Sequence, residues 1–368
     1  MRADRIQAWQ EARRILAIRL DGMGDVLMTT PALRALAEGG ISPHITLLTS
    51  PAAAEVAELV PEIDDVIVFD APWVKSAPQG LPAETTLAMA ERLQAGAFDA
   101  AVVFAVATQN PMPAVMLAYL AGIPLRLAYC RENPYQLLSD WAPDLEQMGS
   151  MRHEVVRQLD LVRCVGFDTT KTTLSLKVTP EARECVERLI SDAGLSWSRL
   201  VVMHPGATAP ARRYSPEQFA EVLRGLHDAG WQAVLTGSVD ERALVDQVRA
   251  MSGTPAVSFA GRLSVAELAA LIANARVLVA NNSGPVHIAA AVGTPVVDLY
   301  ALTNPQHTPW QVPSRVLSHD VPCRNCLKSV CPEGHHDCLR LVSPRQVIDA
   351  VGELIEQPDL CESAQVAF

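Results

Sequence analysis

The segment that most constrains the fold is residues 277–300, with the sequence VLVANNSGPVHIAAAVGTPVVDLY. A short apolar run at Val277–Ala280 predicts a buried strand, and the polar residues Asn281–Pro285 predict a turn. Val286–Val292 has the composition of a helix, which a Gly-Thr-Pro sequence ends before a second apolar run, Val296–Tyr300. Strand, polar turn, helix and strand in this order form the repeating unit of a parallel α/β sheet.

The polar turn in this segment is a candidate anion-binding site. Ligands of open α/β sheets bind beyond the carboxyl ends of the strands. The turn holds Asn282, Ser283, Gly284 and Pro285, and His287 follows about one helical turn later. Free backbone N–H groups at a helix N-terminus attract anions, so we interpret the turn as a cradle for a diphosphate. An ordinary N-cap followed by a core histidine is the alternative.

The alternation of strands and helices recurs in both halves of the chain. In the first half, a strand-like run at Arg14–Leu20 precedes a glycine-containing turn and a helical pattern at Val26–Glu38. In the second half, the alternation restarts with a helix at Pro180–Ala193 and a strand at Leu200–Met203. A chain of 368 residues also exceeds the usual size of a single core. The sequence therefore predicts two similar α/β domains that face each other across a central cleft.

The predicted domain boundary lies in the polar, extended stretch between Phe167 and Pro180. We expect an N-terminal Rossmann-like domain at residues 1–172 and a C-terminal one at residues 173–345. Residues 346–368 are expected to form a C-terminal helix and tail that pack back on the N-terminal domain.

Charge and hydropathy narrow the range of partners. The net charge of −11 argues against nucleic acid as a partner, because phosphate backbones are bound by basic surfaces. The first apolar run, Ile15–Ile18, is too short for the core of a signal peptide. No apolar run reaches the length needed to span a bilayer. We expect a soluble, cytoplasmic protein that makes at most transient contact with membranes.

Three longer motifs follow one another along the chain: RILAIRLDGMGDVLMTTPALRAL, MHPGATAPARRYSPEQFAEVL and VANNSGPVHIAAAVGTPVV. Together they resemble glycosyltransferase family 9, whose best-known members are ADP-heptose:lipopolysaccharide heptosyltransferases. The resemblance implies a GT-B fold, with the active site between two Rossmann-like domains. It also implies inverting transfer of a heptose, or a related sugar, from an ADP-activated donor to a hydroxyl of a lipopolysaccharide-core-like acceptor. No metal or other cofactor is implied for catalysis.

The resemblance assigns roles to individual positions. Asp25 matches the proposed general base, and Glu241 resembles the acid that holds the donor ribose. Arg212, with Arg213 beside it, stands where many members have a lysine two residues before an aromatic residue. The other donor-side positions are Gly24, Thr208 at the diphosphate, Leu263 beside adenine, and the late-motif residues Asn282, Ser283, Gly284, Pro285 and His287.

The chemistry of sugar transfer supports these residue types independently. The acceptor hydroxyl must lose a proton as it attacks, and a carboxylate such as Asp25 can take it. A helix-capping role for Asp25 is the alternative. Arg212 or Arg213 and free N–H groups can stabilise the leaving diphosphate without a metal, although such a pair is also typical of a solvated surface. Glu241 can accept hydrogen bonds from ribose hydroxyls, or it can be an exposed acid at a helix start.

One position departs from the family pattern. Members often carry aspartate where this chain has Asn282, which keeps the hydrogen-bonding reach but loses the charge. This departure puts a charge-based role at the position in doubt and leaves a different donor sugar open.

Four of the eight cysteines form a cluster, Cys323-x2-Cys326-x4-Cys331-x6-Cys338. The spacing is compatible with a tetrahedral structural zinc site. A redox pair and four free thiols are the alternatives.

Three functions remain open at this point. The first is a family 9 transferase with ADP-heptose as the expected donor and a glycolipid or small-molecule glycoside as the acceptor, with Trp73, Lys75 and Arg126 as candidate acceptor contacts. The second is a protein of the same fold that uses another nucleotide sugar on a small natural product, or a nucleotide-sugar epimerase or hydrolase. An epimerase or hydrolase needs further acid/base groups, which the sequence does not show. The third is a binding module that has lost catalysis.

Overall fold

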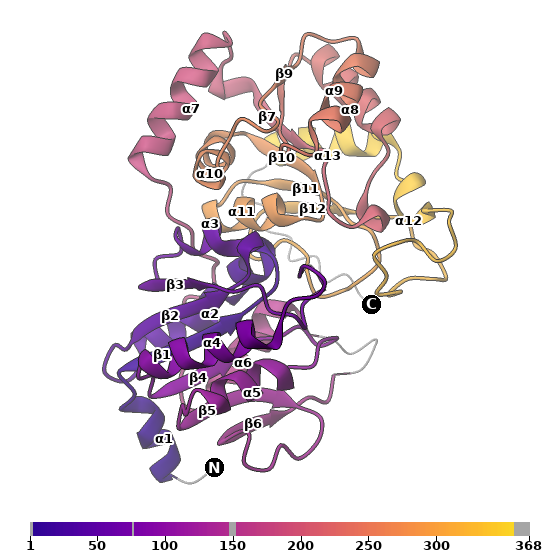
Figure 1. Ribbon diagram of the computed structural model, residues 1–368. Coiled ribbons are helices and arrows are strands. Elements are labelled where there is room, and N and C mark those ends of the chain that lie inside the picture. Colours follow the sequence, from indigo (N-terminus) through magenta and orange to yellow (C-terminus); the bar gives the residue numbers. More distant parts are fainter. Residues whose placement is uncertain (1–2, 76, 147–151, 357–368) are drawn as a thin grey trace. The chain divides into compact units, whose positions relative to one another are not determined.

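The computed structural model describes residues 3–75, 77–146 and 152–356 of the chain (Figure 1). Contacts divide the chain into two compact units, Met1–Lys177 and Val178–Phe368. The division falls inside the polar stretch in which the sequence places the domain boundary. Each unit contains one six-stranded sheet, and every strand pair described is parallel. The predicted α/β class with two Rossmann-like domains is therefore confirmed.

The first unit has the strand order of a Rossmann sheet, β3-β2-β1-β4-β5-β6. Its strands are β1 Arg14–Arg19, β2 His44–Thr49, β3 Asp65–Val68, β4 Ala100–Val103, β5 Leu125–Cys130 and β6 Asp140–Pro143. Its helices are α1 Ala3–Gln10, α2 Met23–Glu38, α3 Ala54–Ala57 with the 3-10 turn η1 Pro51–Ala53, α4 Ala83–Ala95, α5 Met112–Leu120 and α6 Glu154–Arg163. The direction of winding reverses between β1 and β4, so the loops after these two strands occupy the usual ligand position of such a sheet.

The second unit repeats this topology, with the order β12-β11-β10-β7-β8-β9. Its strands are β7 Leu200–His204, β8 Gln232–Leu235, β9 Val257–Ser258, β10 Val277–Asn281, β11 Val296–Leu299 and β12 Ser314–Leu317. Its helices are α7 Pro180–Asp192, α8 Pro216–Asp228, α9 Arg242–Ser252, α10 Val265–Asn274, α11 Gly284–Val292, α12 Asp337–Arg340 and α13 Pro344–Glu356, with 3-10 turns η2 Trp197–Arg199 and η3 Pro210–Arg212. Here the reversal lies between β7 and β10, at the late motif.

Burial on both faces explains the continuous apolar runs of the central strands. Every residue of β4 and of β10 is buried. Sheets covered by helices on both faces carry such runs instead of alternating polar and apolar residues. In the second unit α8 packs with α9 and α13, whereas α10 packs with α7 and α11, and Figure 1 shows helices on both faces of that sheet.

The C-terminal helix contributes to the core of the second unit. α13 packs against α8 and against strands β10, β11 and β12 of its own unit, where Val347, Val351 and Leu354 join the core. Its apolar face is therefore used within the second unit, and the expected packing of residues 346–368 on the N-terminal domain stays a prediction. Gly225 in α8 allows the close approach, because a Cβ there would meet Ile348 Cδ1 at 2.2 Å. The predicted tail at 357–368 lies outside the described residues.

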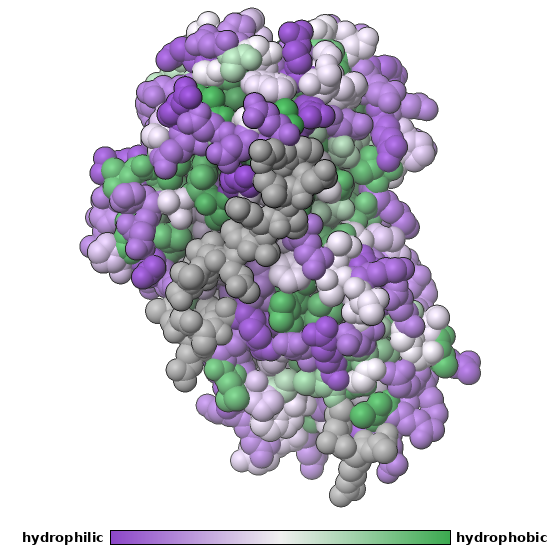
Figure 2. All heavy atoms as spheres, turned by 180° about the vertical axis from the view of Figure 1, so that it is seen from behind, coloured by the Kyte–Doolittle hydropathy of each residue, from purple (hydrophilic) through white to green (hydrophobic). Residues whose placement is uncertain are grey.

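Helix length and surface character bear on membrane contact. None of the helices described is both long and apolar enough to cross a membrane. On the face shown in Figure 2, hydrophilic residues predominate and hydrophobic residues occur in small separate groups.

Candidate functional site

Asp25 lies in the first turn of α2, directly after the carboxyl end of β1. Its Oδ2 accepts a hydrogen bond from the Gly22 backbone N–H at 3.2 Å, and its Oδ1 lies 3.0 Å from Arg19 Nη2. The carboxylate therefore does cap the helix, as the alternative interpretation holds, yet 22% of its side chain remains exposed. The carboxylate is thus fixed in position by two donors and is still partly open to solvent.

A buried arginine organises the acids around Asp25. Arg19 is the last residue of β1 and has no exposed surface. Its guanidinium pairs with Asp21 at 3.0 Å, with Asp25 at 3.0 Å and with Glu154 at 2.9 Å. Burial acts to lower the pKa of Arg19, but the three carboxylates outweigh it and raise the pKa above its ordinary value. The cation therefore stays charged, which an arginine in a fully buried site requires.

The three acids of this cluster are not equivalent. Glu154 opens α6, is fully buried and accepts a hydrogen bond from Gln158 at 2.6 Å. Burial raises the pKa of Asp21 to about 6; Arg19 counteracts this rise and Asp25 adds to it. Asp25 is the most exposed of the three. Among these acids, Asp25 is thus the carboxylate that a reacting hydroxyl can reach most easily.

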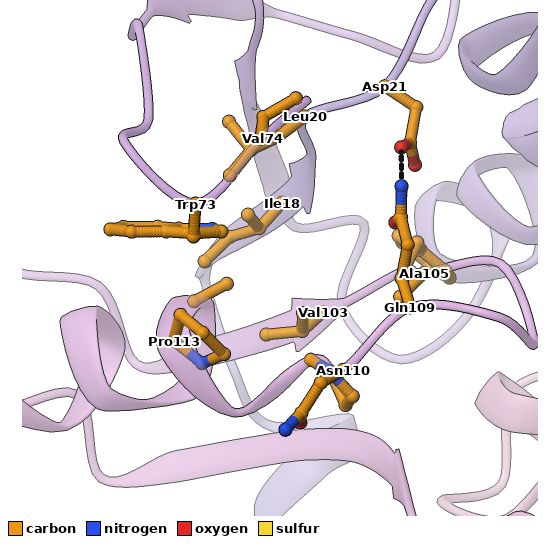
Figure 3. Close-up of a pocket in the computed structure, with 13 residues that line it drawn as sticks. Ile18, Leu20, Asp21, Trp73, Val74, Val103, Ala105, Gln109, Asn110 and Pro113 are labelled. Carbon is orange, nitrogen blue, oxygen red and sulfur yellow. Dashed lines mark hydrogen bonds between the residues drawn. The ribbon is translucent and has the colours of Figure 1, made fainter. Parts of the chain in front are cut away.

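A cavity of about 300 Å³ lies beside this cluster in the first unit. Figure 3 shows Trp73 and Val74 on one side of it, Asp21 and Gln109 on the other, and Ile18 and Val103 between them. Asp21 Oδ1 accepts a hydrogen bond from Gln109 Nε2 at 2.5 Å. Among the predicted acceptor contacts, the structure brings only Trp73 to this cavity.

The other two predicted acceptor contacts lie elsewhere. Lys75 is exposed and is not among the residues that line the cavity. The Arg126 guanidinium donates to backbone carbonyls, with Nε 2.7 Å from Leu137 O and Nη2 2.8 Å from Gln136 O. It also lies over the Tyr119 ring at 5.3 Å. Arg126 therefore connects the 134–138 loop to β5. Because these contacts use its hydrogen-bond donors, its role in the structure is to hold this loop.

In the second unit, Glu241 lies at the carboxyl ends of β7 and β8. It occupies the N-cap position of α9, and its Oε2 accepts from the Ser238 backbone N–H at 2.8 Å. A Cβ on Gly206 would meet Glu241 Oε1 at 2.0 Å, so a side chain at this position would displace the carboxylate. His204 lies 3.7 Å from the same carboxylate and 3.0 Å from Thr236 Oγ1. Burial lowers the pKa of His204, although Glu241 opposes the shift, so the imidazole is neutral at pH 7.

The predicted diphosphate residues gather on the loops after β7 and β10. Thr208 is exposed, and Arg212 is half-buried at the end of η3. Arg213 donates from Nε to Ala207 O at 2.7 Å. Asn281 connects the two loops, because its side chain accepts from Tyr214 N at 2.9 Å and donates to Pro205 O at 2.7 Å.

The late motif forms the helix start that the sequence predicts. Ser283 occupies the N-cap position of α11, and its Oγ donates to Asn281 O at 3.0 Å. Gly284 and Pro285 form the first turn, and His287 is buried one turn into the helix. The first N–H groups of α11 thus lie at the carboxyl end of β10, in the position of an anion site. Leu263 is half-buried and precedes α10.

Asn282 has a role that sequence reasoning missed. Its side chain is buried and donates to Asp298 Oδ2 at 3.0 Å and to His307 O at 2.8 Å. Asp298, in β11, has no exposed surface, and burial raises its pKa to about 8 despite the hydrogen bond from Asn282 and the charge of Arg212. An aspartate at 282 would face a second carboxyl at this distance, so the amide suits the buried partner. The acid within the apolar run VVDLY is the signal that could have identified Asp298.

The cysteine cluster gives no support to the predicted zinc site. Cys323, Cys326, Cys331 and Cys338 carry free thiols, and Cys323 Sγ lies 3.9 Å from His335 Nε2. Cys338 packs against the core, and burial raises the pKa of its thiol, which disfavours the thiolate that binds metal. In the part of the chain that the structure describes, no three His, Cys, Asp or Glu residues are arranged to hold a metal ion.

Comparisons with known proteins point to one family. The model of "Glycosyltransferase family 9 (heptosyltransferase)" matches residues 86–336. Lipopolysaccharide heptosyltransferase 2 of Escherichia coli strain K12 is 26% identical over 367 residues, which cover 94% of this chain and 99% of that protein. Lipopolysaccharide heptosyltransferase 3 of the same strain is 26% identical over 293 residues, covering 78% of this chain and 82% of the relative.

Solved structures show the same fold. The family 9 glycosyltransferase from Veillonella parvula DSM 2008 superposes with a TM-score of 0.79 at 24% identity, covering 94% of this chain and 98% of that one. The ADP-heptose lipopolysaccharide heptosyltransferase II of E. coli gives a TM-score of 0.74 at 23% identity, covering 94% and 99%. These likenesses confirm the GT-B class. The family model spans most of the chain, from helix α4 to the cysteine cluster. The chain therefore belongs to glycosyltransferase family 9 and is a glycosyltransferase.

Proposed function

We propose that this protein transfers a heptose from ADP-heptose to a hydroxyl of a lipopolysaccharide-core acceptor, with inversion at the anomeric carbon. The family model and the curated relatives, which are named as lipopolysaccharide heptosyltransferases, support the sugar and the acceptor class. The observation that carries the mechanism is the position of Asp25. Its carboxylate is fixed by Arg19 and by the Gly22 N–H, and it remains accessible at the carboxyl end of β1.

In the proposed reaction, Asp25 accepts the proton of the acceptor hydroxyl as the oxygen attacks the anomeric carbon. The new C–O bond forms on the face opposite the diphosphate, while the bond from the anomeric carbon to the diphosphate oxygen breaks and ADP leaves. A single displacement of this kind inverts the anomeric centre. Arg19 Nη2, 3.0 Å from Asp25 Oδ1, holds this carboxylate in place for the attack.

The second unit supplies the groups expected at the donor. Arg212, Arg213 and the first N–H groups of α11 would offset the charge that develops on the leaving diphosphate. Glu241 would accept hydrogen bonds from the ribose, since its carboxylate is already placed against Gly206 by the Ser238 N–H. Asn282 supports the fold of this region through Asp298 and His307, so its presence does not by itself argue for a different sugar donor.

A direct transfer assay tests this proposal. Purified protein is incubated with ADP-heptose and with a deacylated, heptose-deficient lipopolysaccharide core, and ADP release and product mass are measured. UDP- and GDP-sugars, and a reaction without acceptor, are the matched controls. We expect ADP release that requires the acceptor and is unaffected by EDTA. Among the nucleotide sugars tested, only ADP-heptose should serve as the donor. Transfer only from a UDP- or GDP-sugar would contradict the donor, and ADP release without acceptor would instead indicate a hydrolase.

A further inference from the structure

The cavity of the first unit has two chemically different walls. Thirteen residues line it, from the ends of β1 and β4, the loop after β3 and the start of α5. One wall is apolar and includes Trp73, whose ring contacts Phe69 edge to face with centroids 5.8 Å apart, which fixes the indole against the core. The opposite wall is polar and carries Asp21 and Gln109 (Figure 3). Such a pairing suits a ring with an apolar face and hydroxyl groups on its edge.

The charge of the lining is one-sided. Asp21 is the ionisable group among the thirteen lining residues, and no lysine or arginine is among them. Behind Asp21, the buried cluster sets three carboxylates, those of Asp21, Asp25 and Glu154, against the one guanidinium of Arg19. A carboxylated or phosphorylated sugar would bring another negative charge to this wall without a cation to meet it, which is unfavourable.

We propose that this cavity is the acceptor subsite and that it selects a neutral pyranose ring over an acidic one. The proposal rests on the proposed function, because the acceptor is taken to be a sugar whose hydroxyl reaches Asp25. Trp73 contacts the carbon face of the ring, and its hydroxyls donate to Asp21 or exchange hydrogen bonds with Gln109. A volume of about 300 Å³ is at the lower end of the range for small-molecule pockets, so one ring occupies it rather than an oligosaccharide.

The two walls have separate duties in this scheme. The contact with Trp73 contributes to the binding affinity and does not depend on the charge of the sugar ring. Asp21 supplies the discrimination, because hydroxyl groups satisfy its free acceptor capacity whereas a second carboxylate does not. Truncating Trp73 should therefore weaken neutral and acidic rings alike, and neutralising Asp21 should change their ratio.

Saturation-transfer difference NMR on the full chain tests the inference, since it detects weakly bound monosaccharides. The probes are methyl α-D-mannopyranoside and its 6-carboxylate analogue, each titrated in the presence of saturating ADP so that the nucleotide site is occupied. Trp73→Ala is the main variant, and Trp141→Ala is its matched control, because Trp141 is an exposed tryptophan on β6 of the same unit and is not among the lining residues. Circular dichroism confirms that each variant is folded.

The wild type is expected to bind the neutral glycoside about tenfold more tightly than the acidic one. Trp73→Ala should weaken the neutral glycoside by about tenfold, whereas Trp141→Ala should leave it unchanged. Asp21→Asn should bring the two probes close to equal affinity. If Trp73→Ala fails to fold, Gln109→Ala replaces it, because Gln109 is exposed and its loss removes a hydrogen-bonding group from the polar wall.

Two results would overturn the inference: equal binding of the neutral glycoside by wild type and Trp73→Ala, or binding of the acidic glycoside as tight as that of the neutral one. Neither outcome depends on turnover. If the protein transfers heptose but shows one of these results, the proposed function stands and the inferred subsite is refuted. A protein that shows the expected binding but transfers no heptose loses the proposed function instead.

Discussion

Replacing Asp298 with asparagine is expected to stabilise the second unit, and increasingly so as the pH rises. Asp298 is fully buried in β11, and Asn282 donates a hydrogen bond to its carboxyl at 3.0 Å. Burial raises its pKa to about 8, although that hydrogen bond and the charge of Arg212 act in the opposite direction. The folded protein therefore keeps the carboxyl protonated at neutral pH, whereas the unfolded chain, with an ordinary pKa of 3.8, ionises it.

The magnitude follows from the two pKa values. A carboxyl whose pKa is higher in the folded state contributes its full stability below the unfolded value, and this contribution is lost as the pH rises through the folded value. Each pH unit between 3.8 and about 8 costs about 1.4 kcal/mol, so the limiting loss is on the order of 5 kcal/mol. An amide of the same shape does not titrate, so Asp298→Asn avoids the loss.

Thermal unfolding followed by circular dichroism measures this difference. Near pH 4 the wild type and Asp298→Asn should differ by only a small amount, because the folded carboxyl is neutral and the pH is still close to the pKa of 3.8 in the unfolded chain. Near pH 8 the variant should unfold about 10 °C higher, since about 1 kcal/mol shifts the Tm of a domain of this size by about 2–4 °C. Asp240→Asn removes an exposed acid of the same unit and should follow the wild-type pH profile. Equal Tm differences at both pH values would refute the reasoning.

Three further substitutions test the buried polar groups. Arg19→Met should lower the free energy of unfolding by about 3–5 kcal/mol, because it leaves buried carboxylates without their cation. The loss should be larger near pH 8 than near pH 5, as measured by thermal melts. Arg19→Lys should recover part of it. Asn282→Asp should lower the Tm, more so at high pH, because it brings a second carboxyl to the 3.0 Å contact with Asp298; no pH-dependent loss would contradict that contact. Gly206→Ala should weaken calorimetric ADP binding by about tenfold by displacing Glu241, whereas Gly352→Ala, where a Cβ meets nothing within 4 Å, should leave it unchanged.

The sequence predicted local units well because their signals are local. The elements β10, α11 and β11 lie within the segment that the apolar runs and the polar turn define. Ser215 stands before a proline that opens α8 and occupies its N-cap position, where its Oγ accepts from Gln218 N at 3.2 Å. Apolar runs indicate buried strands, and capping residues indicate helix starts. Both signals can be recognised in the sequence because they depend on residues close together in the chain.

Contacts between distant residues could not be predicted in the same way. Arg19 and Glu154 are separated by most of the first unit, and only the fold brings β1 and α6 together. The sequence carries only a weak signal for β6, because it is a four-residue edge strand that ends in proline. The position of α1 depends on a distant contact, since Trp9 donates a hydrogen bond to Asp140 on β6 at 2.9 Å. The orientation of Asn282 depends on Asp298 and the His307 carbonyl, which the turn motif does not reveal.

The central claim is that Asp25 takes the proton of the acceptor hydroxyl, and one comparison tests it directly. Transfer from ADP-heptose to the lipopolysaccharide core is measured for wild type, Asp25→Asn and Asp70→Asn, an exposed acid after β3 that serves as the control. ADP affinity is measured in parallel by calorimetry. The account predicts that Asp25→Asn lowers kcat by about 10²–10⁴-fold, with ADP affinity unchanged and Asp70→Asn fully active. A turnover of Asp25→Asn equal to that of the wild type would contradict it.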